Sequence, residues 1–284
     1  MKSLWIATLA VASSAAVASA DVRVKVSPTT ARPGEAVLVS VTGTTELPKG
    51  AADGKPLHFF RAKSGFQALI SIPLDKTLEP ISVEVDSAKL PAKIVIKEKP
   101  FAETSLIVEE EMANPPANER TQIDADNKAI ITAMTKSDDS EPQFTKPFRR
   151  PKGETTSPFG EWRTFNDGHR SQHLGVDVFA KEGTKVGAIN AGTVTLVRDT
   201  FLAGKVVVVA HGGGIASAYF HLSGTSVTEG STVAAGDEIG LAGHTGRTTG
   251  PHLHLAVRVA GKFVDPTTFF KLAITPAAPA TAGK

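Results

Sequence analysis

The chain has 284 residues, of which 41% are hydrophobic and 21% are charged, a composition typical of an ordinary globular protein of about two domains. Its formal net charge of +2 provides no strongly basic surface, so nucleic acid is not expected as a partner. Because the chain has no cysteine, the sequence excludes disulfides, a thiolate nucleophile, cysteine-based zinc sites and lipid attachment to an N-terminal cysteine.

Residues 1–20 have the pattern of a cleavable signal peptide. Lys2 precedes an apolar stretch, and Ala18-Ser19-Ala20 supplies the small residues that typically precede a cleavage site. A single membrane anchor is the alternative, but the stretch is short and rich in Ala and Ser. No later apolar run is long enough to span a bilayer. We therefore expect an exported protein, periplasmic or secreted, with no membrane span after cleavage.

Residues 21–100 contain short strand signals separated by Pro, Gly and Asp. The strand signals are DVRVKV, AVLVSVTG, ALISIP, ISVEV and KIVIKEK, which recur at intervals of roughly ten residues. This spacing predicts a small β-sandwich of the immunoglobulin-like kind. The segment shows no catalytic constellation, and His58 is expected to be a half-buried strand residue.

Residues 101–146 are acidic and are expected to form a connector that lies against a neighbouring domain. One short helix is predicted there, because apolar residues fall near helical spacing at Ile123, Ile130, Ile131 and Met134.

Residues 147–272 are rich in glycine and in short strand signals, with almost no helix signals. This pattern predicts an antiparallel β-rich domain. Residues 273–284 are rich in Ala and Pro and are expected to be a disordered tail. The predicted fold class is therefore all-β, with a small sandwich followed by a second β-rich domain.

Seven of the eight histidines lie in the C-terminal half of the chain. In GPHLHLAV, an alternating strand would place His252 and His254 on one face, about 6–7 Å apart, with the leucines on the other face. In HLGVDV, a straight strand would separate His173 and Asp177 by on the order of 13 Å. The chain must therefore bend between these two residues if they share a metal, and Gly175 would allow the bend.

A His–Asp pair with one further His gives three protein ligands and an open position, which is the pattern of a catalytic zinc site. These ligands also suit iron or manganese, but zinc is the preferred interpretation. The H-E-x-x-H motif is absent, so His221 and one member of the HLH pair are the candidates for proton transfer. Spacing does not choose between His252 and His254 as the third ligand.

A series of motifs between Thr156 and Pro266 occurs in the order and spacing of one known family. They are SPFGEWR, HLGVDVFAKEGTKVGAINAGTV, VVVAHGGG, YFHLS, VTEGSTVAAGDEIGLAG and TGRTTGPHLHLAV, closing on VDP. This region resembles the lysostaphin-type, or LytM, zinc metalloendopeptidases, which are peptidoglycan hydrolases. The motifs cover less than half of the chain, and the likeness of the N-terminal part to multidomain members is loose.

The resemblance implies a role for each of five residues. His173, Asp177 and His254 would ligate one Zn²⁺, while His221 and His252 would orient or deprotonate water and stabilise the oxyanion. The implied substrate is a peptidoglycan peptide, hydrolysed at an amide bond of a stem or cross-link. We expect the enzyme to act as a monomer.

One departure from the family pattern follows the HLH motif. Many members continue with an aromatic residue and then Glu, whereas Leu255 and Ala256 stand here. That Glu is not a zinc ligand in the family, so the departure bears on the shape of the cleft and the support of the ligands.

Two alternative functions and several other residues stay open. Some relatives have lost their ligands and serve as modules that bind or activate wall hydrolases, but the complete set of five residues favours an enzyme. A secreted protease of Gly-rich proteins would need the same residues. His211 is expected to be structural, His169 and His244 could line the cleft, and Asn166 lies where some members carry a loop over the metal.

Overall fold

The computed structural model describes residues 21–277 except 87 and 167. The predicted signal peptide and residues 278–284 of the predicted tail lie outside this part of the chain. Strands dominate the described residues, which confirms the all-β fold class. None of the helices in the described ranges is long and apolar enough to cross a membrane.

Two sheets formed by residues 23–96 enclose one core. The first has the order β1 (Arg23–Ser27), β3 (Ala36–Thr42), β7 (Phe66–Ser71), β6 (Phe60–Arg61). The second has the order β2 (Thr30–Ala31), β9 (Ala92–Ile96), β8 (Ile81–Val85), β4 (Gly50–Ala52), β5 (Lys55–Pro56). Alternate residues of β3, namely Val37, Val39 and Val41, are fully buried in this core together with Val83 and Ile94.

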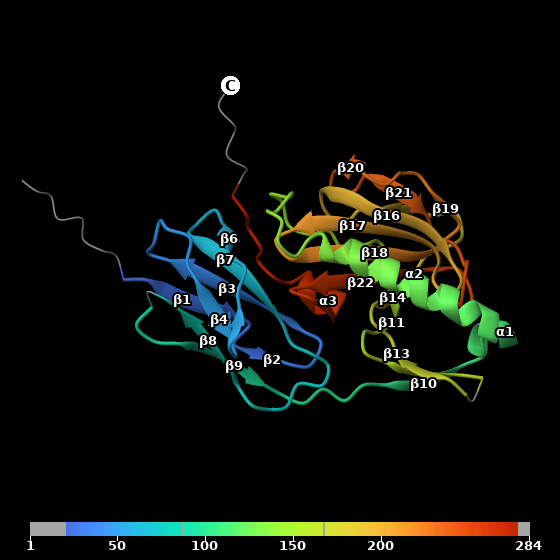
Figure 1. The fold of residues 1–284 in the computed structure, drawn as a ribbon, viewed down its shortest axis with the longest axis horizontal. Helices are drawn as coiled ribbons and strands as arrows, with labels where there is room; N and C mark the ends of the chain where they lie inside the picture. The colour runs from blue at the N-terminus through green and yellow to red at the C-terminus, as the bar shows by residue number, and fades with distance from the viewer. Residues whose placement is uncertain (1–20, 87, 167, 278–284) are drawn as a thin grey trace, which may run out of the picture.

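A larger sheet, antiparallel throughout, lies in the C-terminal half (Figure 1). Its order is β11 (Thr155–Ser157), β14 (Val176–Phe179), β22 (His252–Val259), β18 (Ile215–Leu222), β17 (Gly204–Gly212), β16 (Gly192–Thr200), β20 (Thr232–Val233), with β23 (Lys262–Val264) also paired to β22. A smaller sheet has the order β15 (Lys185–Gly187), β21 (Glu238–Leu241), β19 (Gly224–Thr225). Helix α3 (Pro266–Phe269) follows β23.

The two halves of the molecule share buried apolar contacts. Leu38 and Leu69, from the N-terminal strands β3 and β7, belong to the same buried cluster as Phe159 and Phe269 of the C-terminal half. Leu255 of β22 is fully buried in that cluster as well. One face of β22 therefore packs into the core, which leaves its other face available for the histidines.

The segment predicted as a connector with one short helix contributes more structure than expected. It holds β10 (Glu103–Leu106), α1 (Glu110–Ala113) and α2 (Ala117–Thr135), a helix of 19 residues. Helix α2 crosses the face of β16, β17 and β18 (Figure 1) and buries Ile130 and Met134 against Val206, Val208 and Ala218. Covering these apolar side chains explains why the helix is long and docked.

Strand β10 makes an exception to the antiparallel prediction. It pairs in parallel with β12 (Trp162–Phe165), which in turn pairs antiparallel with β13 (Arg170–Gln172). The segment 101–146 is thereby attached to the C-terminal half at both of its ends, by β10 and by α2.

Residues 273–277 also differ from the expected disordered tail. The Ala277 N–H donates to the Arg61 carbonyl, the Lys63 N–H donates to the Thr275 carbonyl, and Thr275 N–H donates to the side chain of Gln67. These bonds satisfy the free edge of β6 and the turn beyond it, so this part of the tail is held in place.

Candidate metal centre

Antiparallel pairing of β14 with β22 positions the proposed metal ligands. The register places Asp177 directly opposite His254, and their side chains are on the same face of the sheet. His173 stands just before β14, where the chain turns out of β13. The bend that the spacing of His173 and Asp177 requires therefore lies between two strands.

Three potential ligand atoms converge in this place. His173 Nε2 is 3.1 Å from Asp177 Oδ1 and 2.8 Å from His254 Nδ1, and His254 Nδ1 is 2.9 Å from Asp177 Oδ1. Within the described part of the chain, these residues form a group whose ligand atoms all lie within 4.8 Å of one another. Their side chains are only 4%, 9% and 14% exposed, so water does little to solvate them.

The hydrogen bonds of His173 indicate which of its ring nitrogens carries the proton. Nδ1 is 2.8 Å from the Pro158 carbonyl, which can only accept, and 3.1 Å from Arg163 Nη2, which can only donate. Because Arg163 Nη2 has a shorter bond, at 2.7 Å, to Asp177 Oδ2, we assign Nδ1 as the donor to Pro158. The Nε2 lone pair then faces the Asp177 carboxylate and the His254 ring. Two nitrogens and a carboxylate oxygen turned toward one point in a buried place match the ligand set that zinc takes.

Position 175 has no room for a side chain, which explains the glycine there. A Cβ at this position would lie 2.5 Å from the Leu255 carbonyl oxygen and 2.7 Å from His254 Nε2. Any larger residue would push β22 and the His254 ring away. The glycine was expected to permit a bend, and the close approach of β22 is the stronger reason for it.

Arg163 is a part of the site that the sequence did not single out. Its guanidinium Nη2 donates to Asp177 Oδ2 at 2.7 Å, and its Nε donates to Glu161 Oε2 at 2.9 Å. Thr104 of β10 donates to the other oxygen of Glu161. This chain of contacts orients the Asp177 carboxylate so that Oδ1 faces the histidines, and the SPFGEWR motif was the signal that could have pointed to it.

The site favours an ionised carboxylate beside neutral imidazoles. Burial raises the pKa of Asp177, but its close contacts with His173 and His254 outweigh burial and hold this pKa well below its ordinary value. Burial lowers the pKa of His254 to about 4, against the opposing effect of Asp177. Metal ligation requires these protonation states.

His221 lies beside the three converging residues in a strained backbone conformation. Its φ of 60° is in the left-handed region, and its N–H donates to the Ala203 carbonyl. Nδ1 is 2.9 Å from the Thr245 carbonyl, so Nδ1 carries the proton and Nε2 has a free lone pair. Burial, followed by the neighbouring His254 and His252, lowers the pKa of His221 to about 3.

His252 completes the group of five sequence-predicted residues that the structure brings together. Its ring centroid is 5.1 Å from that of His221, and its Nε2 is 3.5 Å from Asp177 Oδ1. Nδ1 is 2.8 Å from the Gly250 carbonyl. Because His254 Nδ1 is closer to Asp177, the geometry favours His254 over His252 as the third member of the ligand group.

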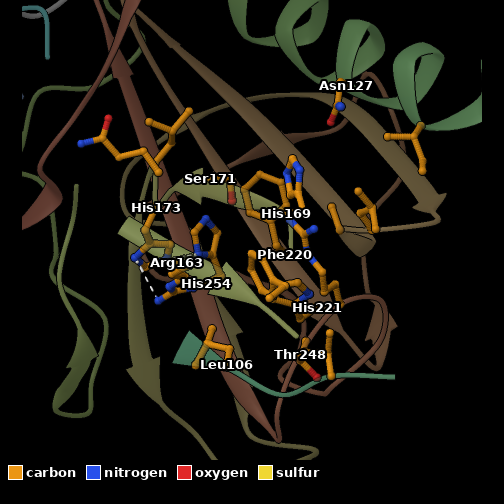
Figure 2. A pocket seen from close by; sticks show the side chains of 18 of the residues that line it. Leu106, Asn127, Arg163, His169, Ser171, His173, Phe220, His221, Thr248 and His254 are labelled. Atoms are coloured by element: carbon orange, nitrogen blue, oxygen red, sulfur yellow. Dashed lines mark hydrogen bonds between the residues drawn. The ribbon is translucent and has the colours of Figure 1, made fainter. Parts of the chain in front are cut away.

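The five residues lie in a cleft of about 880 Å³ between the large sheet, β10 and helix α2. Figure 2 shows His173, His221 and His254 with Phe220 in this cleft and Asn127 on the helix beside them. Ala256 of β22 and Ile131 of helix α2 both line the cleft. The volume is within the range that holds a small ligand or part of a peptide.

The remaining candidate residues fall in different places. His169 lines the cleft, whereas His244 is half-exposed beside Glu182 and is absent from the lining. The Asn166 side chain exchanges hydrogen bonds with the backbone of Val108, so it holds the segment before α1 and does not contact the ligand group. His211 is fully buried away from the cleft.

A family model covers the part of the chain that carries this site. Residues 171–266 match the model of peptidase family M23. This part of the chain is a peptidase M23 domain. The matched range contains all five residues, whereas Arg163 precedes it.

Curated relatives resemble the chain across the M23 domain. DD-carboxypeptidase/endopeptidase Mpg of Neisseria meningitidis serogroup B is 41% identical over 96 residues, which are 34% of this chain and 22% of that protein. Peptidoglycan DD-endopeptidase ShyA of Vibrio cholerae serotype O1 is 42% identical over 93 residues, 33% of this chain and 22% of that protein. The matches therefore span less than a quarter of either relative.

A crystal structure assigned to peptidase M23 from Pseudomonas aeruginosa resembles a larger part of the chain. It has a TM-score of 0.63 and 28% sequence identity, and the alignment covers 84% of this chain and 93% of that one. This likeness extends beyond the M23 domain into the N-terminal half.

Proposed function

We propose that this protein is an exported zinc metalloendopeptidase that hydrolyses amide bonds in the stem peptides or cross-links of peptidoglycan. The observation that carries the proposal is the convergence of His173, Asp177 and His254 beside His221 and His252 in an open cleft. The names of the relatives Mpg and ShyA support the substrate class, and the pattern of residues 1–20 supports export.

The donor set fits a zinc ion held by His173 Nε2, Asp177 Oδ1 and His254 Nδ1. A bound Zn²⁺ supplies Lewis acidity, which polarises an amide carbonyl and lowers the pKa of water. Arg163 keeps the carboxylate of Asp177 oriented, and the Pro158 carbonyl keeps the proton of His173 on Nδ1. These contacts preorganise the ligands before substrate arrives.

His221 and His252 carry the proton transfers in this proposal. The Nε2 atom of His221 is neutral and unprotonated at neutral pH, so it can accept a proton from the attacking water. The same atom can return that proton to the amine nitrogen when the C–N bond breaks. His252, on the same face of β22, has Nδ1 bonded to the Gly250 carbonyl, so its protonated form can donate from Nε2 to the oxygen on which negative charge develops.

A non-catalytic module that binds or activates wall hydrolases remains the runner-up. Such a module would not need an ionised Asp177 held by Arg163, nor a strained His221 with a free Nε2. Backbone strain of this kind persists where the surrounding structure maintains it, and it is common at active sites. These features favour an enzyme.

The test is digestion of purified sacculi by the zinc-loaded protein, with mass spectrometry of the released fragments. We expect soluble muropeptides with one new amine and one new carboxyl group at a defined peptide bond. A parallel digest of an elastin-like protein separates a general protease of Gly-rich sequences from a wall enzyme. Intact sacculi after incubation with fully loaded, folded protein would contradict the proposal.

A further inference from the structure

The loop before β22 carries an arginine whose side chain enters the cleft. Arg247 lines the cleft together with Arg163 and the histidines. Its backbone N–H donates to the Leu202 carbonyl at 2.8 Å, which fixes the loop. The guanidinium carbon Cζ lies 4.0 Å from the centroid of the buried Phe165 ring, so one face of the guanidinium is stacked on an aromatic side chain.

The Arg247 guanidinium has no hydrogen bond or ion pair to any residue that the structure describes. Four other arginines of the C-terminal half are matched with carboxylates: Arg163 with Asp177 and Glu161, Arg170 with Glu103, Arg198 with Asp126, and Arg258 with Asp138. Burial, and then the positive charge of Arg163, lower the pKa of Arg247. A partly buried cation with unused donors is costly unless an anion joins it.

The charge of the cleft is also unbalanced in favour of an anion. Arg120, Arg163 and Arg247 line it, while the acidic lining residues are Asp177 and Asp124 among those described. Asp177 is occupied by Arg163 and the histidines, and Asp124 is an exposed residue of helix α2. No carboxylate of the cleft is therefore placed to neutralise Arg247.

We infer that Arg247 binds a carboxylate of the substrate and so makes the enzyme select peptides that carry a free carboxylate near the scissile amide. Stacking on Phe165 leaves the edge of the guanidinium, which carries its N–H donors, free to form paired hydrogen bonds with the two carboxylate oxygens. This assignment rests on the proposed endopeptidase function and names the group that the cleft recognises. A peptide offers that group at its C-terminus or on the side chain of an acidic residue.

The experiment combines a change in the enzyme with a change in the substrate. The substrates are a cross-linked muropeptide dimer and the same dimer with its carboxylates converted to carboxamides, each assayed with the zinc-loaded full chain. The variants are Arg247→Gln, Arg247→Lys and Arg32→Gln, the last being a matched loss of charge at an exposed residue of the N-terminal half. Zinc content and melting temperature are measured for each variant.

The wild type should cleave the acid dimer with a kcat/KM about tenfold to a hundredfold above that of the amide dimer, since a hydrogen bond to a charged group has this worth. Arg247→Gln should lose that preference, mainly through a higher KM for the acid dimer, while Arg32→Gln keeps it. Arg247→Lys should retain part of the preference because it keeps the charge without the planar fork. Dimers amidated only at the C-terminus or only at an internal carboxylate then identify the group that is bound.

Equal cleavage of the two dimers by the wild type would overturn the role of Arg247 and leave the endopeptidase proposal intact. A uniform loss of rate on both dimers in Arg247→Gln would also overturn it, because that pattern indicates a structural role. If the wild type cleaves neither dimer, both proposals fail together. Should Arg247→Gln not fold, the preference for the acid dimer is compared between the wild type and Arg247→Lys. A smaller preference in Arg247→Lys supports the proposal, and an unchanged preference overturns it.

Discussion

Two buried polar clusters lie in the large sheet, one on β17 and β18 around a single histidine and one at β14 and β22 around two, and they differ in how their polar atoms are satisfied. In the first, His211 of β17 is 2.8 Å from the Ala191 carbonyl through Nδ1 and 2.8 Å from Ser217 Oγ through Nε2. Ser217 Oγ is 3.0 Å from Tyr219 Oη, which accepts from the Ile189 N–H. Every polar side-chain atom of this cluster has a partner within the protein.

In the second cluster, some polar atoms lack a hydrogen-bond donor within the protein. His173 Nε2, Asp177 Oδ1 and His254 Nδ1 are turned toward one another, and with the His173 proton on Nδ1 these three atoms share at most one proton, that of His254. His211 and His254 are equally neutral, since burial lowers the pKa of each to about 4. Burial and residue type are therefore shared, and the presence of unmatched lone pairs distinguishes a candidate metal centre from a structural network.

The sharpest way to break this comparison is to remove one histidine from each cluster. His254→Ala should lower zinc affinity by more than about a hundredfold, because residues that merely support ligands are already worth 10- to 100-fold, and activity should vanish with the metal. His211→Ala should be less stable but keep its zinc. The readouts are zinc per chain by elemental analysis and hydrolysis of sacculi; full zinc occupancy in His254→Ala would show that the assignment is wrong.

A second variant separates ligation from proton transfer at the candidate metal centre. His221→Ala should retain zinc, while turnover falls about 10²- to 10⁴-fold because a general base is lost. Its dependence on pH should also change, since the group that accepts the proton is gone. A rate close to that of the wild type would remove His221 from the mechanism.

The cluster around His211 predicts how the free energy of unfolding depends on pH. The pKa of His211 falls from 6.5 to about 4 on folding because of burial, so the unfolded chain binds more protons between these values. The contribution of His211 is complete above pH 6.5 and is lost as pH falls toward about 4, amounting to about 3 kcal/mol. Urea unfolding of the wild type and of His211→Gln across this range measures the difference; parallel pH profiles would contradict the prediction.

The smallest expected effect concerns one hydroxyl. Tyr219→Phe leaves the buried Ile189 N–H without its acceptor, which should lower the free energy of unfolding by about 1–3 kcal/mol. Zinc content and activity should be unchanged, because the cluster does not reach the cleft. Ser226→Ala, which removes an exposed hydroxyl bond to Glu238, is the control and should have little effect on stability. A loss of zinc in Tyr219→Phe would mean that the two clusters are coupled.

The candidate site residues could be predicted from the sequence because short motifs and the alternation within single strands identify them. The alternation of HLHLAV predicted that His252 and His254 share a face and that Leu253 and Leu255 face the core, and the buried leucines agree. The order of the motifs indicated the M23 family, and the all-β class followed from short strand signals between turns. The strand spacing also indicated the need for a bend between His173 and Asp177.

Features that depend on contacts between distant segments could not be predicted in this way. Helix α2 was expected to be short, but it has 19 residues. Its length reflects the apolar face of β17 and β18 that it covers, which its own sequence pattern does not reveal. Arg163 and Arg247 lie within the quoted motifs, but their roles become visible only when one is seen bound to Asp177 and the other over the ring of Phe165 without an anion. Residues 273–277 carry no strand signal, but the edge at Arg61 and Lys63 holds them.

By itself, the sequence determined which residues alternate along each strand, and hence which side chains could share a face, since side-chain direction follows from the backbone repeat of a single strand. Only the tertiary structure decided which lone pairs meet, which ring nitrogen is protonated and which cation is left without a partner. Those properties depend on distances of about 3 Å between residues far apart in the chain, and hydrogen bonds and ion pairs act only at such short range.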